Sequence, residues 1–364
     1  MRLLFVIYGS IDQISGGYIY DRKVVEYLRS QGDRVDILSL RPLPYLFSLV
    51  QGSDPRLHRV LNTRAAEYDA VVVDELVHPT VFRTVARRNS PTPVLVLVHH
   101  LRSSERGGGA PQLLVRAVSR LIEHRLLNSA DGIIVNSETT ACSVEALLDR
   151  RLPIWICKPG CDGLSHQGGG SRGRRPDAEG RIRLLITGSV IPRKGHGGLI
   201  RVLAGCMDLD WRLSIVGESS DSSYRRRLDR LIRRFGMEQR IFWLGCLCGE
   251  ALAEEYREAD LFVFPSQYEG YGISLAEALF AGLPVLTFSV GAIPEVVRDP
   301  AMLIPEKDFE EFKRRLRSFV QDGTFRKKLL ENARKLGSVL SPWRESVQAF
   351  RDILIHATGV KDGY

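Results

Sequence analysis

Short apolar runs alternate with longer amphipathic segments along this chain of 364 residues. In the first half, the apolar runs occupy positions 2–7, 35–38, 70–73, 94–98, 132–135 and 154–157. Between most of them apolar residues recur at helical spacing, as in 17–30, 111–128 and 137–148. Strands that are apolar throughout are typical of parallel sheets covered on both faces, and their alternation with helices indicates βαβ units. The first half therefore predicts a doubly wound α/β domain.

A Gly/Ser/Arg-rich stretch interrupts this pattern after residue 163, and its lack of periodicity predicts a flexible linker. The alternation then restarts, with predicted strands at 182–187, 212–216, 241–244, 261–264 and 285–288. Apolar residues at helical spacing in 343–356 predict a terminal amphipathic helix. We expect the following parts: an N-terminal domain at 1–163, a linker at 164–180, a second domain at 181–340 and a C-terminal helix in 341–364.

Composition is that of an ordinary soluble globular protein, with 44% hydrophobic and 26% charged residues. The apolar run after Met1-Arg2 is too short for a signal-peptide core, and no run approaches the ~18 apolar residues of a membrane span. The six cysteines lack a CxxC spacing, which favours reduced thiols and a cytoplasmic location. A net charge of +8 favours phosphate-bearing ligands, anionic membranes or nucleic acid.

The segment Pro265–Leu279 carries the clearest chemical signal. It follows a predicted buried strand and contains two carboxylates, Glu269 and Glu277, with seven residues between them. Gly270 and Gly272 allow backbone N–H groups to approach a ligand, and a helix N-terminus behind such a loop favours anions. Carboxylates that accept hydrogen bonds from hydroxyls, beside amides that bind phosphate, suit a nucleotide-activated sugar.

A structural interpretation of the same two acids stays open at this point. Ser274 with Glu277 three residues later matches a helix capping box. Under the same structural interpretation, Glu269 is a solvated acid on the loop that binds no ligand.

A second candidate segment follows the first strand after the predicted linker and leads into a helix. It contains Gly188, Arg193 and Lys194 at the carboxyl edge of the predicted sheet, where open α/β folds bind ligands. The guanidinium and the ammonium together are suited to a diphosphate. In the first domain, Gly16 and Gly17 begin a predicted helix whose amides suit an anion, and the sequence His99-His100 ends a strand.

Several other functions are disfavoured by missing motifs. The chain has no GxGxxG turn after its first strand, no GxxxxGK[ST] loop and no GxSxG elbow. It also lacks a basic stripe interleaved with aromatic residues, so we expect no nucleic acid partner. Asp208 and Asp210 fit a DxD pattern, but they precede a predicted strand and are expected in a turn, with no metal bound.

Taken together, the motifs resemble the donor site of retaining GT-B glycosyltransferases of family 4. The resemblance rests on the strand, Pro265-Ser266, the sequence Glu269-Gly270-Tyr271-Gly272, the Glu-x7-Glu spacing (EX7E) and the sequence 281–285, Ala-Gly-Leu-Pro-Val. It extends along nearly the whole chain and implies two Rossmann-like domains that face a cleft, with the C-terminal helix crossing back onto the first domain. It also implies transfer of a sugar from a nucleoside diphosphate with retention, by front-face displacement and without a metal or other cofactor.

The resemblance assigns roles to individual residues. It implies that Glu277 binds the ribose and Glu269 the sugar hydroxyls, while Arg193 and Lys194 bind the diphosphate. His99 is implied to reach the donor sugar, whereas His100 departs from the usual pattern. The remaining implied donor contacts are Gly16, Gly17, Gly188, Gly270, Tyr271, Gly272 and Ile273.

Three points stay open from sequence. A nucleotide-sugar epimerase of the same fold and a non-catalytic nucleotide-sugar-binding protein are alternatives to a transferase. The acceptor is unidentified: a glycan, a lipid-linked molecule or a small molecule. Finally, the segments 41–50 and 111–127 combine apolar residues with arginines, so they are either core-facing helices or surfaces that contact the anionic inner face of a membrane.

Overall fold

The computed structural model describes residues 1–63, 67–105, 110–161, 180–219 and 221–360. The chain divides into two compact units: Met1–Gly160 with Trp343–Tyr364, and Cys161–Pro342. The predicted linker lies outside the described residues, apart from Gly180.

The first unit is built on a six-stranded parallel sheet in the order β2-β1-β3-β4-β5-β6. The strands are β1 (Arg2–Tyr8), β2 (Arg34–Leu40), β3 (Ala70–Asp74), β4 (Val94–Val98), β5 (Gly132–Val135) and β6 (Ile154–Ile156). The α-helices are α1 (Gly16–Ser30), α2 (Tyr45–Gln51), α3 (Pro55–Thr63), α4 (His78–Ala86), α5 (Ala110–Leu127), α6 (Glu138–Glu145) and α14 (Trp343–Thr358), with short 3-10 helices η2 (Glu75–Val77) and η3 (Arg102–Ser104).

The second unit repeats this plan with a parallel sheet in the order β12-β11-β10-β7-β8-β9. Its strands are β7 (Ile182–Thr187), β8 (Trp211–Val216), β9 (Ile241–Gly245), β10 (Leu261–Phe264), β11 (Val285–Phe288) and β12 (Leu303–Ile304). Its helices are η4 (Pro192–Lys194), α7 (His196–Ala204), α8 (Ser222–Arg234), α9 (Gly249–Glu258), α10 (Ile273–Phe280), α11 (Ile293–Val296), α12 (Phe309–Gln321) and α13 (Gly323–Gly337). The predicted α/β class with two doubly wound sheets is confirmed.

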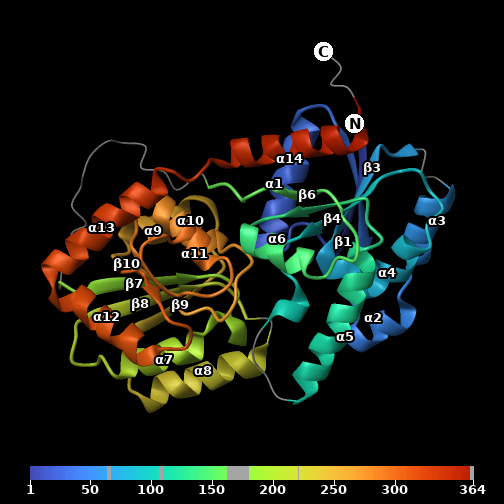
Figure 1. Cartoon of the computed structure of the whole chain (residues 1–364). Helices are drawn as coiled ribbons and strands as arrows, with labels where there is room; N and C mark the ends of the chain where they lie inside the picture. The colour runs from blue at the N-terminus through green and yellow to red at the C-terminus, as the bar shows by residue number, and fades with distance from the viewer. Residues whose placement is uncertain (64–66, 106–109, 162–179, 220, 361–364) are drawn as a thin grey trace. The chain divides into compact units, whose positions relative to one another are not determined.

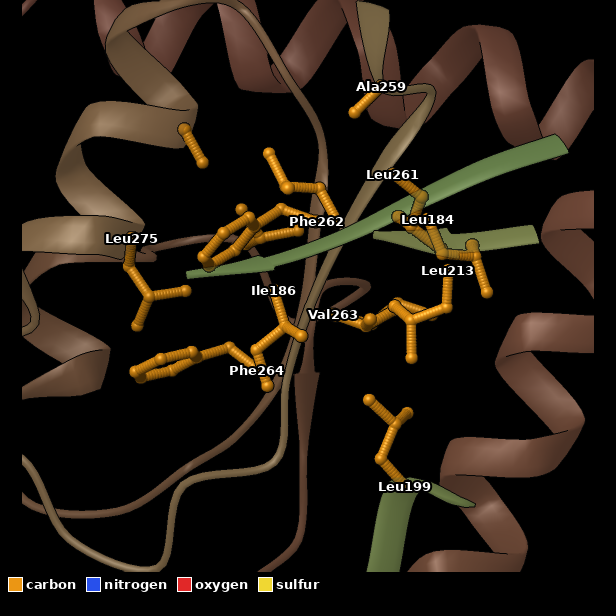
Figure 2. Packing of buried hydrophobic residues seen from close by; sticks show 14 of the residues in the cluster. Leu184, Ile186, Leu199, Leu213, Ala259, Leu261, Phe262, Val263, Phe264 and Leu275 are labelled. Atoms are coloured by element: carbon orange, nitrogen blue, oxygen red, sulfur yellow. The ribbon is translucent and has the colours of Figure 1, made fainter. Parts of the chain in front are cut away.

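The core of the second unit lies on both faces of this sheet. Phe262 and Phe264 on β10 stack with ring centroids 5.6 Å apart, and both are fully buried. Side chains from β7, β8, α7 and α10 pack around them, as Figure 2 shows for Leu184, Ile186, Leu199, Leu213 and Leu275. Burying each such side chain contributes about 1.5–3 kcal/mol, so this core fixes the strand ends that carry the candidate site.

In the first unit, α14 packs against α1, two helices that are far apart in sequence (Figure 1, blue and red). Tyr20 on α1 meets Trp343 and Phe350 edge-on, with ring centroids 5.9 and 6.1 Å apart. The Tyr20 hydroxyl donates to the Cys157 carbonyl at 3.1 Å. The α1 helix, whose N-terminus carries the predicted Gly16-Gly17 pair, is therefore held on both the sheet side and the α14 side.

The helix α2 occupies Tyr45–Gln51, after two prolines and before Gly52, within the segment 41–50 for which a core-facing helix was one of the two interpretations. One strand was not predicted. The strand β12 has only two residues, too few for an apolar run to stand out in the sequence.

Candidate functional site

The candidate site of the second unit lies at the point where its strand order reverses. From β7 the chain runs outward to β8 and β9, then returns to place β10 on the other side of β7. The loops after β7 and β10 consequently leave the sheet in opposite directions, which opens a crevice at the carboxyl ends in this type of fold. The β7 loop carries Gly188, Arg193 and Lys194, and the β10 loop carries Glu269.

Lys194 and Glu269 join these two loops through a partly buried ion pair. The Lys194 Nζ lies 2.7 Å from Glu269 Oε1, and the two side chains are 14% and 9% exposed. Burial raises the pKa of Glu269, but the charges of Lys194 and Arg193 outweigh it, so the net shift is downward. Burial lowers the pKa of Lys194, although Glu269 opposes that shift. The buried Ser266 hydroxyl also donates to Glu269 Oε1.

Arg193 makes the second connection between the loops. Its Nη1 donates to the Tyr268 carbonyl at 2.5 Å and lies 3.5 Å from Glu269 Oε1. The Gln267 N–H in turn donates to the Arg193 carbonyl at 2.8 Å. Two cations and one carboxylate therefore meet at the switch point, and this leaves the cluster with a net positive charge suited to a phosphate group.

The predicted glycine loop leads directly into α10. Gly272 has φ of +96°, in the left-handed region that favours glycine, and is the N-cap of the helix that begins at Ile273. Gly270 and Tyr271 precede it, and the Tyr271 side chain is buried in the hydrophobic core. The contact with the sugar donor that the resemblance implies for Tyr271 would therefore be made by its backbone.

Glu277 is held by a tyrosine, not by a capping box. Because Gly272 is the N-cap, Ser274 lies inside the first turn of α10. Glu277 Oε2 accepts a hydrogen bond from the Tyr256 hydroxyl at 2.9 Å, and the same hydroxyl lies 2.8 Å from Thr187 Oγ1 at the end of β7. The capping-box interpretation is thus wrong for this helix, and the three side chains link α9, α10 and β7.

Gly188 follows Thr187 and completes this group. A Cβ atom placed on Gly188 would lie 3.9 Å from Lys194 Cε and 4.0 Å from Ser274 Oγ. The structure thus brings Gly188, Lys194 and the first turn of α10 together.

The predicted residues of the first unit form a separate group. Helix α1 begins at Gly16, and a Cβ atom on Gly17 would lie only 3.0 Å from His99 Cδ2. The absence of a side chain at Gly17 therefore allows the imidazole of His99 to pack against the first turn of α1. Tyr20 meets the same imidazole edge-on at 5.4 Å, and Asn136 Nδ2 donates to the His99 carbonyl at 2.8 Å.

His99 and His100 have different partners. His99 is buried, with Nε2 at 2.9 Å from Asp21 Oδ1. Burial opposes a charge on the imidazole, but Asp21 and nearby acids outweigh it and raise the pKa of His99 to about 9. His100 Nε2 lies 3.1 Å from Glu105 Oε1 on a half-exposed loop.

Acid–histidine groups with metal-like spacing occur twice among the described residues. Asp21, Asp74 and His99 form one group, with ligand atoms within 4.8 Å of one another. The other group consists of Glu75, His78 and Glu123. In both groups, a histidine nitrogen lies within 3.1 Å of a carboxylate oxygen. Among the described residues, Asp21 Oδ2, Asp74 Oδ2 and Glu75 Oε1 are buried without a hydrogen-bond partner.

The DxD pattern lies in the turn before β8, as predicted. Both Asp208 carboxylate oxygens accept hydrogen bonds from the Arg317 guanidinium, at 2.8 and 2.6 Å. Asp208 is therefore an ion-pair partner of α12.

The sequence did not single out Asp21 or Tyr256. Asp21 lies four residues after Gly17 on α1, a spacing that places both on one helix face beside the strand ends. An acid on an otherwise apolar face was the available signal. For Tyr256, which lies on α9 outside both motifs, the sequence offers no such signal.

The fold is that of GT-B glycosyltransferases. The chain aligns with sucrose-phosphate synthase from Thermosynechococcus elongatus at a TM-score of 0.83 and 19% identity, covering 99% of this chain and 100% of that one. HepE from Anabaena in complex with UDP and glucose aligns at a TM-score of 0.76 and 19% identity, covering 98% and 100%.

Sequence comparisons point to the same class. Residues 171–336 match the family model described as "Glycosyl transferases group 1". The D-inositol 3-phosphate glycosyltransferase of Nocardia farcinica is 30% identical over 204 residues, which cover 53% of this chain and 45% of that protein. That of Mycobacterium sp. (strain KMS) is 27% identical over 294 residues, covering 75% and 66%. The chain thus spans about half the length of the curated relatives it matches.

Proposed function

We propose that this protein is a glycosyltransferase of group 1, family 4, that transfers a sugar from a nucleoside diphosphate to an acceptor with retention. The observation that carries the proposal is the cluster of Arg193, Lys194 and Glu269 at the switch point of the second sheet, beside the N-terminus of α10. Neighbours of the same fold support it, because the HepE structures contain UDP, glucose or UDP-glucose.

In this proposal the two cations bind the diphosphate and stabilise the charge that develops on it as the sugar leaves. Glu269, held ionised by them, accepts hydrogen bonds from the sugar hydroxyls. Glu277, oriented by Tyr256, binds the ribose. The leaving phosphate takes the proton of the acceptor in a front-face displacement, so no protein nucleophile and no metal is required. Gly188 and the amides of the first α10 turn complete the donor contacts.

Product analysis with a panel of UDP-, GDP- and ADP-sugars tests the proposal. We expect one donor to be hydrolysed slowly without acceptor and transferred in its presence, giving a product of unchanged anomeric configuration. An inverted product would overturn the retaining mechanism. Elimination or epimerised sugar without transfer would favour the epimerase, and binding without any turnover would favour the non-catalytic alternative.

We further propose that the first unit contacts an anionic membrane surface and receives its acceptor there. Large apolar side chains are exposed on α2 and α5, with Phe47 68%, Leu114 68% and Leu121 66% exposed. The opposite face of α5, with Ile122 and Leu126, is buried in the core. The α5 helix therefore fits both interpretations left open by the sequence. One of its faces packs in the core, and a second set of apolar side chains, which includes Leu114 and Leu121, is exposed.

Arginines accompany this exposed strip. Arg120 and Arg125 are exposed on α5, and Arg83, Arg87 and Arg125 line a surface pocket of ≈ 350 Å³. Apolar residues beside basic ones suit the headgroup region of an anionic bilayer, where each arginine contributes about 1 kcal/mol. Among the described residues, no helix is both long enough and apolar enough to cross a bilayer. The proposed association is therefore peripheral, on the cytoplasmic side.

Flotation with phosphatidylglycerol vesicles tests this second proposal. We expect binding at low salt that weakens at high salt, and weaker binding for the double variant Leu114→Ser/Leu121→Ser. Val339→Ser is the matched control, since Val339 is 70% exposed in the other unit. Equal binding of both variants, or no binding of the wild type at low salt, would reject it.

A further inference from the structure

Two carboxylates and an imidazole meet inside the first unit, in a group that the proposed donor site does not use. Glu75 lies on η2 directly after β3, His78 is the first residue of α4, and Glu123 lies on α5. The three residues are 1%, 2% and 0% exposed. One ligand atom from each lies within 4.8 Å of the other two. The group therefore joins three elements of this unit at a point that water does not reach.

The charges of this group do not balance by themselves. Two ionised carboxylates leave one negative charge even when the imidazole of His78 is protonated. Among the described residues, neither Glu75 nor Glu123 forms an ion pair with a lysine or an arginine. A buried charge without compensation is strongly unfavourable. The group therefore has to hold either an extra proton or a cation, and a divalent cation beside two carboxylates and a neutral imidazole gives a neutral group.

Hydrogen bonds from neighbouring residues orient one of the carboxylates and the imidazole. The Ser103 N–H donates to Glu123 Oε1 at 3.1 Å, and the Ser103 hydroxyl donates to Oε2 of the same side chain. The Tyr45 hydroxyl lies 3.0 Å from His78 Nε2. Metal-binding carboxylates and histidines typically have outer partners of this kind, which fix the ligand atoms in place.

The second carboxylate has an oxygen atom without a partner. Glu75 Oε1 is buried, and among the described residues no hydrogen bond reaches it. His78 Nδ1 lies 3.1 Å from this oxygen, but Nδ1 makes its hydrogen bond with the Glu75 carbonyl oxygen at 2.9 Å. A buried oxygen that accepts no hydrogen bond has lost its water without compensation. A cation bound by Glu75 Oε1 and His78 Nδ1 would supply the missing partner, while Nε2 keeps its contact with Tyr45.

We propose that Glu75, His78 and Glu123 bind one structural divalent cation, and that Zn²⁺ fits this set of ligands best. Imidazole nitrogen together with carboxylate oxygen suits Zn²⁺, whereas Mg²⁺ and Ca²⁺ favour oxygen ligands alone. The ion connects the end of β3 to α4 and α5. This inference goes beyond the proposed function, because the ion takes no part in sugar transfer. Its removal is therefore expected to lower the melting temperature and to leave initial rates unchanged.

Calorimetric titration of the chelator-treated full chain with ZnCl₂ and with MgCl₂ tests the proposal. We expect one Zn²⁺ to bind per chain and to raise the melting temperature, because the ion binds only the folded protein. Mg²⁺ should bind at least about 10-fold more weakly than Zn²⁺. Absence of Zn²⁺ binding would overturn the proposal and would mean that a proton balances the group. Equal affinity for the two ions would overturn the preference for Zn²⁺.

Two variants place the ion at this group. Glu75→Gln should weaken Zn²⁺ binding at least about 10-fold, since loss of an outer partner alone typically costs that much. His124→Gln removes the imidazole of an exposed acid–histidine pair with Asp149 and is the matched control, which should bind Zn²⁺ like the wild type. Equal affinity of Glu75→Gln and the wild type, or weaker binding by His124→Gln alone, would assign the ion to another place.

The absorption spectrum of the Co²⁺-substituted wild type identifies the ligand atoms and does not depend on a variant that folds. We expect visible bands of Co²⁺ without the intense ultraviolet band that thiolate ligands give. That band would assign the ion to cysteines and contradict the proposal. If Glu75→Gln does not fold, Tyr45→Phe replaces it and should weaken Zn²⁺ binding by about 10- to 100-fold, because His78 then loses its outer partner. Unchanged affinity of Tyr45→Phe would contradict binding through His78.

Discussion

The Lys194 ammonium and the Glu269 carboxylate lie 2.7 Å apart, although they come from loops after two different strands. The strand order places β7 beside β10, so residues 75 positions apart meet at one sheet edge. The pair balances charge in the structure described here. A bound donor diphosphate would be a second anion beside Lys194. The same ammonium group would then stabilise the fold through Glu269 and bind the substrate through the diphosphate.

Lys194→Ala is expected to reduce kcat/KM by roughly 10²–10³, because a cation that stabilises the departing diphosphate is lost. Stability should also fall, since Glu269 then remains partly buried beside one cation fewer. Steady-state kinetics and thermal unfolding measure the two effects.

The double variant Lys194→Met/Glu269→Gln separates stability from catalysis. It removes both members of the pair, so no carboxylate stays partly buried without Lys194, and it should unfold at a higher temperature than Lys194→Ala and stay inactive. Lys313→Ala, in the surface pair with Glu310, is the matched control and should affect neither property. Recovery of activity in the double variant would show that the ion pair serves folding alone.

Glu277→Gln should weaken nucleotide binding while keeping the free energy of unfolding within about 1 kcal/mol, because an amide still accepts the Tyr256 hydrogen bond. Tyr256→Phe keeps the ring stack on Phe262 and removes only the hydroxyl. We therefore expect it to weaken binding less than Glu277→Gln does. The reverse order, or a lower melting temperature of Glu277→Gln with unchanged binding, would assign Glu277 a structural role.

Activity is expected to survive EDTA, because Arg193, Lys194 and the N-terminus of α10 meet the diphosphate charge. Asp208→Asn should behave like the wild type with and without chelator, since Asp208 pairs with Arg317. Initial rates before and after dialysis against EDTA are the measurement. Loss of activity that Mg²⁺ or Mn²⁺ restores would show that the donor needs a metal.

Asp74→Asn should flatten the pH dependence of stability. Burial raises the pKa of Asp74 from its ordinary 3.8 to about 8 in the folded protein. The contribution of the protonated side chain to the free energy of unfolding is therefore fully present below about pH 3.8 and is lost as the pH rises through about 8. Between about pH 5 and 8 the free energy of unfolding of the wild type should fall more steeply than that of the variant. Asp352→Asn, at an exposed position on α14, is the control for denaturant titrations. Parallel curves for Asp74→Asn and the wild type would mean that Asp74 is ionised in the fold.

The sequence predicted the strands other than β12 because they contain apolar runs with no competing pattern, as in Val94–Val98. It also predicted the loops that carry Lys194 and Glu269, because both follow such runs. It could not distinguish a capping box from a ligand contact at Glu277, since that depends on whether the helix begins at Ile273 or later. The structure excludes the capping box, because Gly272, with its left-handed φ, is the N-cap, and the ligand contact of Glu277 stays a prediction.

The sequence could not predict side-chain contacts between distant elements, for a different reason. Tyr256 contacts Glu277 across two helices, and Asp21 contacts His99 over 78 positions. Neither contact has a local spacing rule, because it follows from the order of strands in a sheet. The exposed strip of α5 was ambiguous because its apolar residues cover more of the helix circumference than one buried face needs.

Calorimetric titration with nucleotides tests the central claim most directly. We expect one of UDP, GDP and ADP to bind the wild type, its monophosphate to bind more weakly, and Arg193→Ala to bind the diphosphate at least about 10-fold more weakly. No binding of any nucleoside diphosphate, or equal affinity of the wild type and Arg193→Ala, would contradict a donor site at the β7–β10 switch point.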